Sequence, residues 1–466
     1  MPGKIVFNAR LPSFDAVESF CIYSNMTRRL KGKKVHFIGV GGISMSALLS
    51  IAHHLGAEVS GSDLAASDAF KTLKTEGYDV YLGSRPAYAA AADLVVYNAA
   101  IKDQDAELVA AGDKAVTRAR FLEDICAFFK RTAAISGTHG KTTVSAMIAC
   151  AALAGGVKFS AHIGGIVRNF QNNSFLAGDD LFITEACEYK DSFLTLSPDL
   201  AVVLNVEWDH SDYFENVERL YASFGAFCAN VKKGGAVVLG EGVSSHIDVC
   251  ANDEIRIYRY GEDFSMEPQE GGGFTLYVKN EPPRFFATSA KGRHNLYNAA
   301  VAAFCSLLLG IEEDAVRMGL AAFLGVKRRY EYMGKTALGA TVIHDYAHHP
   351  SEIEAVMKVA RENAGRLIVV FEPHTFSRTQ ALFEDFVKVL STADVLVMLP
   401  TYSAREVPAE GVDAKTLFCA TNAPERYYFS DYDGAKRLLD RVALSHDTVL
   451  ILGAGSVERL AESFSK

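Results

Sequence analysis

The sequence lacks any run of 18 or more apolar residues, and its first residues do not form the apolar stretch of a secretory signal. A helix needs about 20 apolar residues to cross a bilayer, so we expect no membrane-spanning helix and no membrane partner. Positive charge is also scarce. Lys and Arg number 47 against 56 Asp and Glu, a net charge of −9. This balance argues against a nucleic-acid partner, although net charge alone does not exclude a local basic pocket.

Cysteine pairs with metal-binding spacing are absent too. No two of the eight cysteines form a Cys-x-x-Cys pair, which argues against a zinc cluster. Disulfide frameworks belong mainly to small secreted domains, so we expect reduced thiols, most of them buried, and a cytoplasmic location. The cysteines are Cys21, Cys126, Cys150, Cys187, Cys228, Cys250, Cys305 and Cys419.

Internal repeats and low-complexity segments are missing as well, so the 466 residues must form ordinary domains. This length exceeds what one hydrophobic core supports. Strands alternate with helices, which predicts α/β domains with parallel sheets, at residues 27–131, 132–326 and 327–466. Residues 254–260 and 274–278 alternate in polarity, which predicts antiparallel strands with one wet face. Residues before Met26 carry no pattern, and Met26 is a candidate alternative start.

A glycine-containing loop lies between a predicted strand and a predicted helix, where a phosphate would bind loop amides and the helix N-terminus. Lys141 would neutralise the β- and γ-phosphates of ATP, and Thr142 would offer a hydroxyl to Mg²⁺. The full P-loop pattern places a glycine where Ile135 stands, so this is a shortened variant. A chance match in an ordinary turn is the alternative. The loop comprises Gly137, Thr138, His139, Gly140, Lys141, Thr142 and Thr143.

A second glycine loop follows the first predicted strand and contains Gly39, Gly41 and Gly42. Ser44 stands where the dinucleotide-binding motif has its third glycine. Asp63 follows about 20 residues later, where dinucleotide folds place the carboxylate that binds a ribose. The spacing alone would suggest NAD, but a UDP moiety satisfies the same physical requirements.

Acidic residues and a histidine follow two further predicted strands, at the strand ends where α/β sheets bind ligands. Glu185 and Glu188 follow one strand, and His210 follows the next. Together with Thr142 they would hold one or two Mg²⁺ ions that bridge ATP phosphates. Since Mg²⁺ prefers oxygen ligands, His210 could instead position an incoming amine. Solvated loop charges are the alternative for each residue.

These motifs, in this order, resemble those of the Mur ligases over residues 33–455. Three departures stand out: Cys187 and Tyr189 replace Asp and Ser, Gly83-Ser84 replaces a Gly-His pair, and Tyr330 replaces Phe. The first departure leaves the role of Glu188 open. The resemblance rests on residues 37–45, 136–143, 185–188, 205–210, 292–298, 328–331, 344–350, 372–379 and 453–455.

The resemblance implies three domains: a Rossmann-like N-terminal domain for a UDP-sugar, a P-loop-type central domain for ATP and a Rossmann-like C-terminal domain for an amino acid. It implies the ATP-dependent ligation of L-alanine to the lactyl carboxylate of UDP-N-acetylmuramate, through an acyl phosphate, in peptidoglycan precursor synthesis. The alternative within the family is a ligase that recycles murein tripeptide. Outside it stand an NAD-dependent oxidoreductase and a regulatory ATP-binding protein. Whether the chain is a monomer or a homodimer stays open.

Residue roles follow from the resemblance in the same way. The residues expected to bind the UDP-sugar are Gly39, Gly41, Gly42 and Ser44 at the diphosphate and Asp63 at the uridine end. Those expected at the phosphate and metal centre are Lys141, Thr142, Thr143, Glu185 and His210, of which Lys141, Glu185 and His210 would be catalytic. Those expected to help hold ATP are Asn295, Arg329 and Asp345. Those expected in the amino-acid pocket are His348, His374 and Arg378, whose guanidinium suits a carboxylate.

Overall fold

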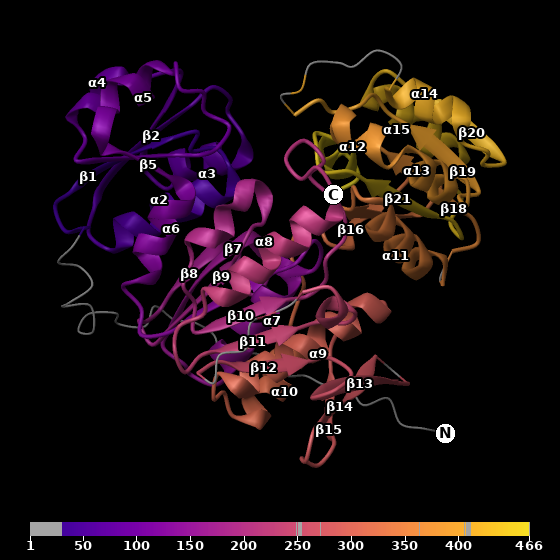
Figure 1. Cartoon of the computed structure of the whole chain (residues 1–466). Helices are drawn as coiled ribbons and strands as arrows, with labels where there is room; N and C mark the ends of the chain where they lie inside the picture. Colours follow the sequence, from indigo (N-terminus) through magenta and orange to yellow (C-terminus); the bar gives the residue numbers. More distant parts are fainter. Residues whose placement is uncertain are drawn as a thin grey trace. The chain divides into compact units, whose positions relative to one another are not determined.

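A computed structural model describes residues 30–247, 249, 254–270, 272–362, 364–404, 406 and 412–465. The candidate start at Met26 and the residues before it lie outside this description. The chain divides into two compact units (Figure 1). The first unit comprises the residues up to Glu207, with Val217–Ser289 and Tyr297–Leu324. The second unit comprises Trp208–Asn216, Ala290–Leu296 and Gly325–Lys466.

The first unit opens with a five-stranded parallel sheet in the order β3-β2-β1-β4-β5. This order is that of dinucleotide-binding folds, whose ligands lie at the point where the strand order reverses. The reversal falls between β1 and β4, and the first glycine loop starts directly after β1. The strands are β1 (Lys34–Ile38), β2 (Glu58–Asp63), β3 (Asp79–Leu82), β4 (Leu94–Tyr97) and β5 (Ala115–Thr117). The helices are α2 (Ile43–His54), α3 (Asp68–Thr75), α4 (Pro86–Ala91), α5 (Ala106–Ala111), the 3₁₀ helix η1 (Gly112–Lys114) and α6 (Arg118–Cys126).

The first unit also holds a seven-stranded sheet in the order β12-β11-β10-β6-β9-β7-β8. Its central strands are mostly apolar and are buried except for the last residue of β9, as strands covered on both faces are. All neighbours run parallel except β7 and β8. The strands are β6 (Thr132–Ser136), β7 (Phe159–Val167), β8 (Asn172–Leu176), β9 (Leu181–Glu185), β10 (Leu200–Val203), β11 (Ala236–Leu239) and β12 (Arg256–Arg259). The helices are α7 (Lys141–Ala154), η2 (Tyr189–Thr195), α8 (Val217–Ala229), η3 (Val243–Ser245), α9 (Arg293–Leu308, which enters this unit at Tyr297) and α10 (Glu313–Ala321).

One strand prediction was wrong and its companion was confirmed. The segment at 254–260 forms β12, which pairs parallel with β11 at the edge of the seven-stranded sheet. An edge strand with one wet side alternates in polarity whichever way its neighbour runs, so the pattern did not reveal the direction. The segment at 274–278 does lie in an antiparallel sheet. The strands of this sheet are β13 (Phe264–Gln269), β14 (Gly273–Val278) and β15 (Arg284–Ala287).

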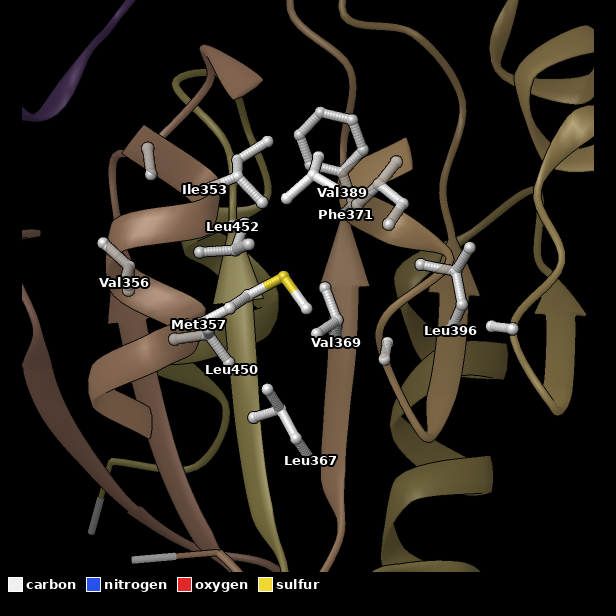
Figure 2. Packing of buried hydrophobic residues seen from close by; sticks show 14 of the residues in the cluster. Ile353, Val356, Met357, Leu367, Val369, Phe371, Val389, Leu396, Leu450 and Leu452 are labelled. Atoms are coloured by element: carbon white, nitrogen blue, oxygen red, sulfur yellow. The ribbon is translucent and has the colours of Figure 1, made fainter. Parts of the chain in front are cut away.

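The second unit is built on a six-stranded sheet in the order β16-β17-β21-β18-β19-β20, parallel except for β16. Figure 2 shows Ile353 and Met357 of α11 packed over Val369 of β18 and Leu450 of β21. The strands are β16 (Glu331–Lys335), β17 (Thr341–Asp345), β18 (Leu367–Phe371), β19 (Val395–Met398), β20 (Glu425–Tyr428) and β21 (Thr448–Leu452). The helices are α11 (Pro350–Arg361), α12 (Phe376–Ala381), α13 (Phe383–Leu390), α14 (Ala414–Ala420), α15 (Tyr432–Val442) and α16 (Glu458–Glu462).

These sheets confirm the predicted α/β class. The predicted domain boundaries at 131/132 and 326/327 stay predictions. The two compact units divide the chain in another way, because the second unit also includes residues 208–216 and 290–296. Within the described residues, no helix combines the length and the apolar character that a membrane span requires. The described cysteines are free, and Cys126, Cys150, Cys228 and Cys305 are buried as expected.

Candidate active site

The first glycine loop is fixed by the end of β2. The backbone N–H groups of Gly39 and Val40 donate to the Ser62 carbonyl at 2.8 and 3.0 Å, and Gly41 donates to Asp63 Oδ2 at 2.8 Å. A Cβ on Gly41 would lie 2.9 Å from that same oxygen, so the loop needs glycine there. Asp63 therefore holds the loop in shape, and its predicted contact with the uridine end stays a prediction.

Helix α2 begins directly after this loop, and its first turn offers backbone donors. The N–H groups of Ile43, Ser44 and Met45 have no intrahelical acceptor, as at any helix start. The N-cap residue is Gly42, which has no side chain that could accept from them. Helix N-termini of this kind bind phosphate groups. The geometry agrees with the diphosphate site expected for Gly39, Gly41, Gly42 and Ser44.

The phosphate loop joins β6 to α7 and depends on two glycines with positive φ. Gly137 (φ +132°) packs so closely on Leu204 and Asn205 that a Cβ would lie 3.0–3.1 Å from their atoms. Gly140 (φ +86°) caps α7, and a Cβ there would lie 2.7 Å from Asn298 Oδ1. Left-handed backbone and close contacts both require glycine.

Asn205 shapes the same loop from the end of β10. Its Oδ1 accepts from the N–H of His139 at 2.8 Å, and its backbone carbonyl accepts from the N–H of Thr138 at 3.1 Å. The hydroxyl of Thr138 in turn donates to the Glu207 carbonyl at 3.0 Å. The first amides of α7, at Lys141, Thr142 and Thr143, have no intrahelical acceptor and suit a phosphate.

Lys141 lies folded over the loop. Its Nζ is 2.9 Å from Glu188 Oε2 and 3.1 Å from Glu188 Oε1, and it also donates to the carbonyls of Gly137 and Thr138. Burial alone would lower the pKa of Lys141, but the Glu188 carboxylate raises it above its ordinary value. Lys141 therefore carries its positive charge at the phosphate loop.

Glu185 ends β9, the strand that pairs with β6, so it lies beside the phosphate loop at the carboxyl edge of the sheet. Its Oε1 accepts from the N–H of Gly164 at 2.5 Å, and a Cβ on Gly164 would lie 2.8 Å from Oε2. The Thr142 hydroxyl and the Glu185 carboxylate are oxygen donors of the kind that Mg²⁺ prefers. The residues present fit the expected metal, whereas the third expected ligand, His210, belongs to the second unit.

The second unit contains the other residues expected to hold ATP. Asp345 ends β17, and its carboxylate accepts from the N–H groups of Tyr330 at 2.7 Å and Ala347 at 2.8 Å. Burial raises the pKa of Asp345 to about 6, although Arg329 opposes that rise. Arg329 lies over the Tyr346 ring at 5.3 Å. Asn295 donates from Nδ2 to the Lys291 carbonyl at 2.8 Å.

The expected amino-acid pocket residues gather in the second unit. The rings of His348 and His374 lie 5.6 Å apart, and the ring of His374 stacks on Tyr402 at 5.5 Å. Burial lowers the pKa of His348 to about 3 and that of His374 to about 4, with Arg378 adding to both effects. Both imidazoles are therefore neutral at pH 7.

Arg378 already has a carboxylate partner. Its Nε donates to Asp209 Oδ1 at 2.8 Å and its Nη2 donates to Asp209 Oδ2 at 3.1 Å, with both side chains buried. Nη1 donates to His374 Nδ1 at 3.1 Å and lies 3.3 Å from the His374 carbonyl. The bidentate grip expected for a substrate carboxylate is thus made with Asp209, and contact with the amino acid stays a prediction.

His210 lies next to Asp209 in the same unit. Its backbone has φ +55° and its N–H donates to Asp209 Oδ1 at 2.7 Å. Asp209 thus fixes both the peptide of His210 and the guanidinium of Arg378. Sequence reasoning missed Asp209, although its place directly before His210 was a usable signal.

Comparison with known proteins places these features in a family. Family models match residues 34–130 (Mur ligase family, catalytic domain), 135–306 (Mur ligase middle domain) and 328–455 (Mur ligase, glutamate ligase domain). A UDP-N-acetylmuramate–L-alanine ligase from Agathobacter rectalis is 36% identical over 448 residues, which cover 93% of this chain and 97% of that protein. The chain belongs to the Mur ligase family. A ligase of the same name from Acetivibrio thermocellus is 35% identical over 452 residues, 94% of this chain and 96% of that protein.

Solved structures of Mur ligases share the fold. The UDP-N-acetylmuramate-alanine ligase of Thermotoga maritima superposes with a TM-score of 0.75 at 24% identity, covering 93% of this chain and 98% of that one. A murein peptide ligase from Psychrobacter arcticus gives a TM-score of 0.71 at 21% identity, with the same coverage. At these identities the superpositions show the shared three-domain α/β architecture.

Proposed function

We propose that this Mur ligase joins L-alanine to the lactyl carboxylate of UDP-N-acetylmuramate, with conversion of ATP to ADP and phosphate. The observation that carries the proposal is the similarity over more than nine-tenths of the chain to relatives that bear this activity in their names. The ADP-forming ligase class explains the phosphate loop, which an oxidoreductase would leave without a role.

The chemistry requires activation because an oxide ion is a poor leaving group from a carboxylate. A lactyl carboxylate oxygen attacks the γ-phosphorus of ATP, and the bond between that phosphorus and the bridging oxygen of ADP breaks. The amine of L-alanine then attacks the acyl carbon, phosphate leaves, and the nitrogen loses a proton. Lys141 and the first amides of α7 are placed to stabilise the charge on the transferring phosphoryl group.

Thr142 and Glu185 are the residues of the first unit that we propose as metal ligands, with His210 as a third. A bound Mg²⁺ would supply additional charge stabilisation at the phosphates. Gly164 orients the Glu185 carboxylate, and Glu188 keeps Lys141 charged over the loop. These contacts assign Glu188 the role of a partner for Lys141, which the sequence left open.

For the amino acid, we propose the region around His348 and His374. The ammonium group of an amino acid must lose one proton before it attacks, and His348 Nε2 is suited to accept a hydrogen bond from the amine, because Nδ1–H of His348 donates to the Tyr346 carbonyl. His374 instead accepts on Nδ1 from Arg378, so its Nε2–H is a donor. Arg378 contacts His374 and pairs with Asp209, so these residues form one cluster with His348. We propose that this cluster orients L-alanine.

The test is phosphate release from ATP with Mg²⁺ and UDP-N-acetylmuramate, with and without L-alanine, then with murein tripeptide. Release that requires both the sugar nucleotide and L-alanine supports the proposal. Release with tripeptide but not with alanine would transfer the protein to the recycling ligases. Absence of release with either acceptor would refute both activities.

A further inference from the structure

A chain of hydrogen bonds connects the first glycine loop to the end of β9. Ser44 Oγ lies 2.9 Å from His162 Nε2, and His162 Nδ1 lies 3.1 Å from Thr184 Oγ1. Arg118, the first residue of α6, donates from Nη1 to Ser44 Oγ at 3.2 Å. Thr184 directly precedes Glu185. Residues from four parts of the sequence thus meet between the expected diphosphate and metal sites.

The direction of each bond in this chain is determined. A guanidinium only donates, so Ser44 Oγ accepts from Arg118 and keeps one lone pair and its own hydrogen for the contact with His162 Nε2. At the other end, the Thr184 hydroxyl donates to the Glu185 carbonyl at 3.2 Å. Thr184 Oγ1 therefore accepts from His162 Nδ1–H. His162 is neutral, so its proton on Nδ1 leaves Nε2 as an acceptor, and the Ser44 hydroxyl donates to it.

His162 is buried and neutral, which keeps this arrangement fixed. Burial, together with the nearby charge of Arg118, lowers the pKa of His162 to about 3. The side chain lies on β7, two residues before Gly164, whose N–H binds the Glu185 carboxylate. The same short stretch of β7 therefore contacts both the Ser44 hydroxyl and the Glu185 carboxylate.

Arg118 has no ion-pair partner among the carboxylates in the described part of the chain. Its guanidinium donates to the neutral hydroxyls of Ser44 and, at 3.5 Å, of Ser192, which itself donates to the Cys187 carbonyl. Arg120, two residues later, behaves differently and pairs with Glu123 at 2.9 Å and Asp124 at 3.4 Å. A half-buried guanidinium held by neutral acceptors has capacity left for an anion.

We propose that Arg118 binds the negative charge of the sugar nucleotide at the start of α2, and that Ser44 and His162 are positioning residues that hold Arg118 there. This inference rests on the proposed function and names a further ligand of its substrate. The amides at the start of α2 and the Arg118 guanidinium meet at Ser44, so one anion would contact both. Ser44 supplies a hydroxyl where the dinucleotide motif has glycine, and that hydroxyl connects Arg118 to His162.

The first experiment compares Arg118→Gln with Arg120→Gln, a matched loss of one charge on the same helix. Binding of UDP-N-acetylmuramate without ATP is measured by calorimetry, and KM values for both nucleotides are measured by phosphate release. Arg118→Gln should weaken UDP-N-acetylmuramate binding about 10- to 100-fold, as for a lost hydrogen bond to a charged group. Arg118→Lys should recover part of the loss, and the KM for ATP should change less than threefold, roughly within the noise of surface substitutions.

Two results would overturn the assignment. One is wild-type affinity for UDP-N-acetylmuramate in Arg118→Gln. The other is an equal weakening in Arg120→Gln, which would reflect net charge alone. Calorimetry with UDP-N-acetylmuramate does not depend on turnover or on the identity of the amino acid. If wild type binds the sugar nucleotide but does not ligate alanine, the proposed function fails while the role of Arg118 is still decided.

The positioning role is tested by a double-mutant cycle on Ser44→Ala and His162→Phe. Each change should weaken UDP-N-acetylmuramate binding several-fold, and the double variant should bind about as well as the weaker single variant, because both break one chain. Ser44→Thr, which keeps a hydroxyl, should retain more affinity than Ser44→Ala. Effects that multiply in the double variant, or unchanged affinity in both singles, would refute the connection.

Discussion

At the scale of single residues, two buried ion pairs organise the candidate site. Lys141 pairs with Glu188 in the first unit, and Arg378 pairs with Asp209 in the second. Removing one member of such a pair leaves an uncompensated charge away from water, which costs about 3–5 kcal/mol. Loss of function and loss of folding must therefore be separated in any test of these residues.

For Lys141, a second substitution at its partner Glu188 separates the loss of function from the loss of folding. Lys141→Ala should lower kcat by at least about 10²- to 10³-fold, because it removes a positive charge that stabilises the transferring phosphoryl group. It should also lower the free energy of unfolding, because the buried ion pair of Lys141 with Glu188 is lost. The double variant Lys141→Ala with Glu188→Gln should regain stability in urea denaturation without regaining turnover. Recovery of turnover in the double variant would contradict a direct role for Lys141.

Asp209 gives a prediction with a defined pH dependence. Burial alone would raise the pKa of Asp209, but Arg378 lowers it well below its usual range. A depressed folded-state pKa contributes stability that is present above the unfolded value near 3.9 and is lost as the pH falls towards the folded value. Asp209→Asn should therefore cost about 3–5 kcal/mol at pH 7.

The measurement is denaturant unfolding of both proteins from pH 7 down to pH 3. The difference in unfolding free energy between wild type and Asp209→Asn should shrink once the pH falls below about 4. Asp212→Asn, an exposed change three residues later, serves as the control and should cost little. A difference that stays constant over the whole range would argue against an ionised Asp209 as the stabilising partner.

The sequence predicted contiguous segments of the site but not the contacts between segments that are far apart in the chain. Gly137–Thr143 is contiguous, so its loop could be recognised from spacing alone. The partners Ser44 and His162 are 118 positions apart, and Asp209 and Arg378 are 169 positions apart. No local pattern specifies such pairs, since they exist only after the sheets assemble. Arg118 carried no signal because it looks like any arginine at a helix start.

At the scale of elements, α7 has a positive-φ glycine at each end, but the two differ in their surroundings. Gly140 before the helix is packed against Asn298 and Leu204, whereas Gly156 after it has φ +64° and open space where a Cβ would lie. The first position carries the phosphate loop and the second only ends the helix. Gly156 is therefore favoured only by its backbone conformation, whereas Gly140 is required by both its backbone conformation and its close packing.

Alanine substitutions at these two positions should therefore differ. Gly156→Ala should cost roughly 1–2 kcal/mol for the left-handed backbone and leave ATP affinity unchanged. Gly140→Ala should cost more in unfolding free energy and should weaken ATP binding at least about tenfold, because the loop must move away from Asn298. Urea denaturation and equilibrium ATP binding report the two effects. Equal stability losses together with intact ATP binding would contradict the packing argument.

Element prediction succeeded where burial is complete, whereas partial burial left one strand direction wrong. The strands β6, β9, β18 and β21 read as continuous apolar segments because both faces of their sheets are covered. β12 at a sheet edge has one wet side, and its polarity pattern is compatible with either strand direction. Direction is set by the connection between strands, which residue periodicity does not encode.

At the scale of the whole molecule, binding should be visible as stabilisation. A non-hydrolysable ATP analogue at 100 times its Kd should stabilise the folded protein by about 2.7 kcal/mol. If the Thr142 hydroxyl holds the metal, removal of Mg²⁺ with EDTA should reduce the rise in melting temperature that the ATP analogue causes in the wild-type protein. In Thr142→Val the rise should be small with or without Mg²⁺. A wild-type rise that ignores EDTA would argue against a metal in the nucleotide site.

The chain passes between the two units five times, after residues 207, 216, 289, 296 and 324. This connectivity has a consequence for biosynthesis. Asp209 leaves the ribosome 169 residues before Arg378, an interval of roughly 10–30 s at bacterial rates of translation. During that time the segment Trp208–Asn216 has no second unit to join and its carboxylate stays hydrated. The nascent first unit can therefore complete its own sheets early, while the part of the site that includes His210 forms only near the end of synthesis.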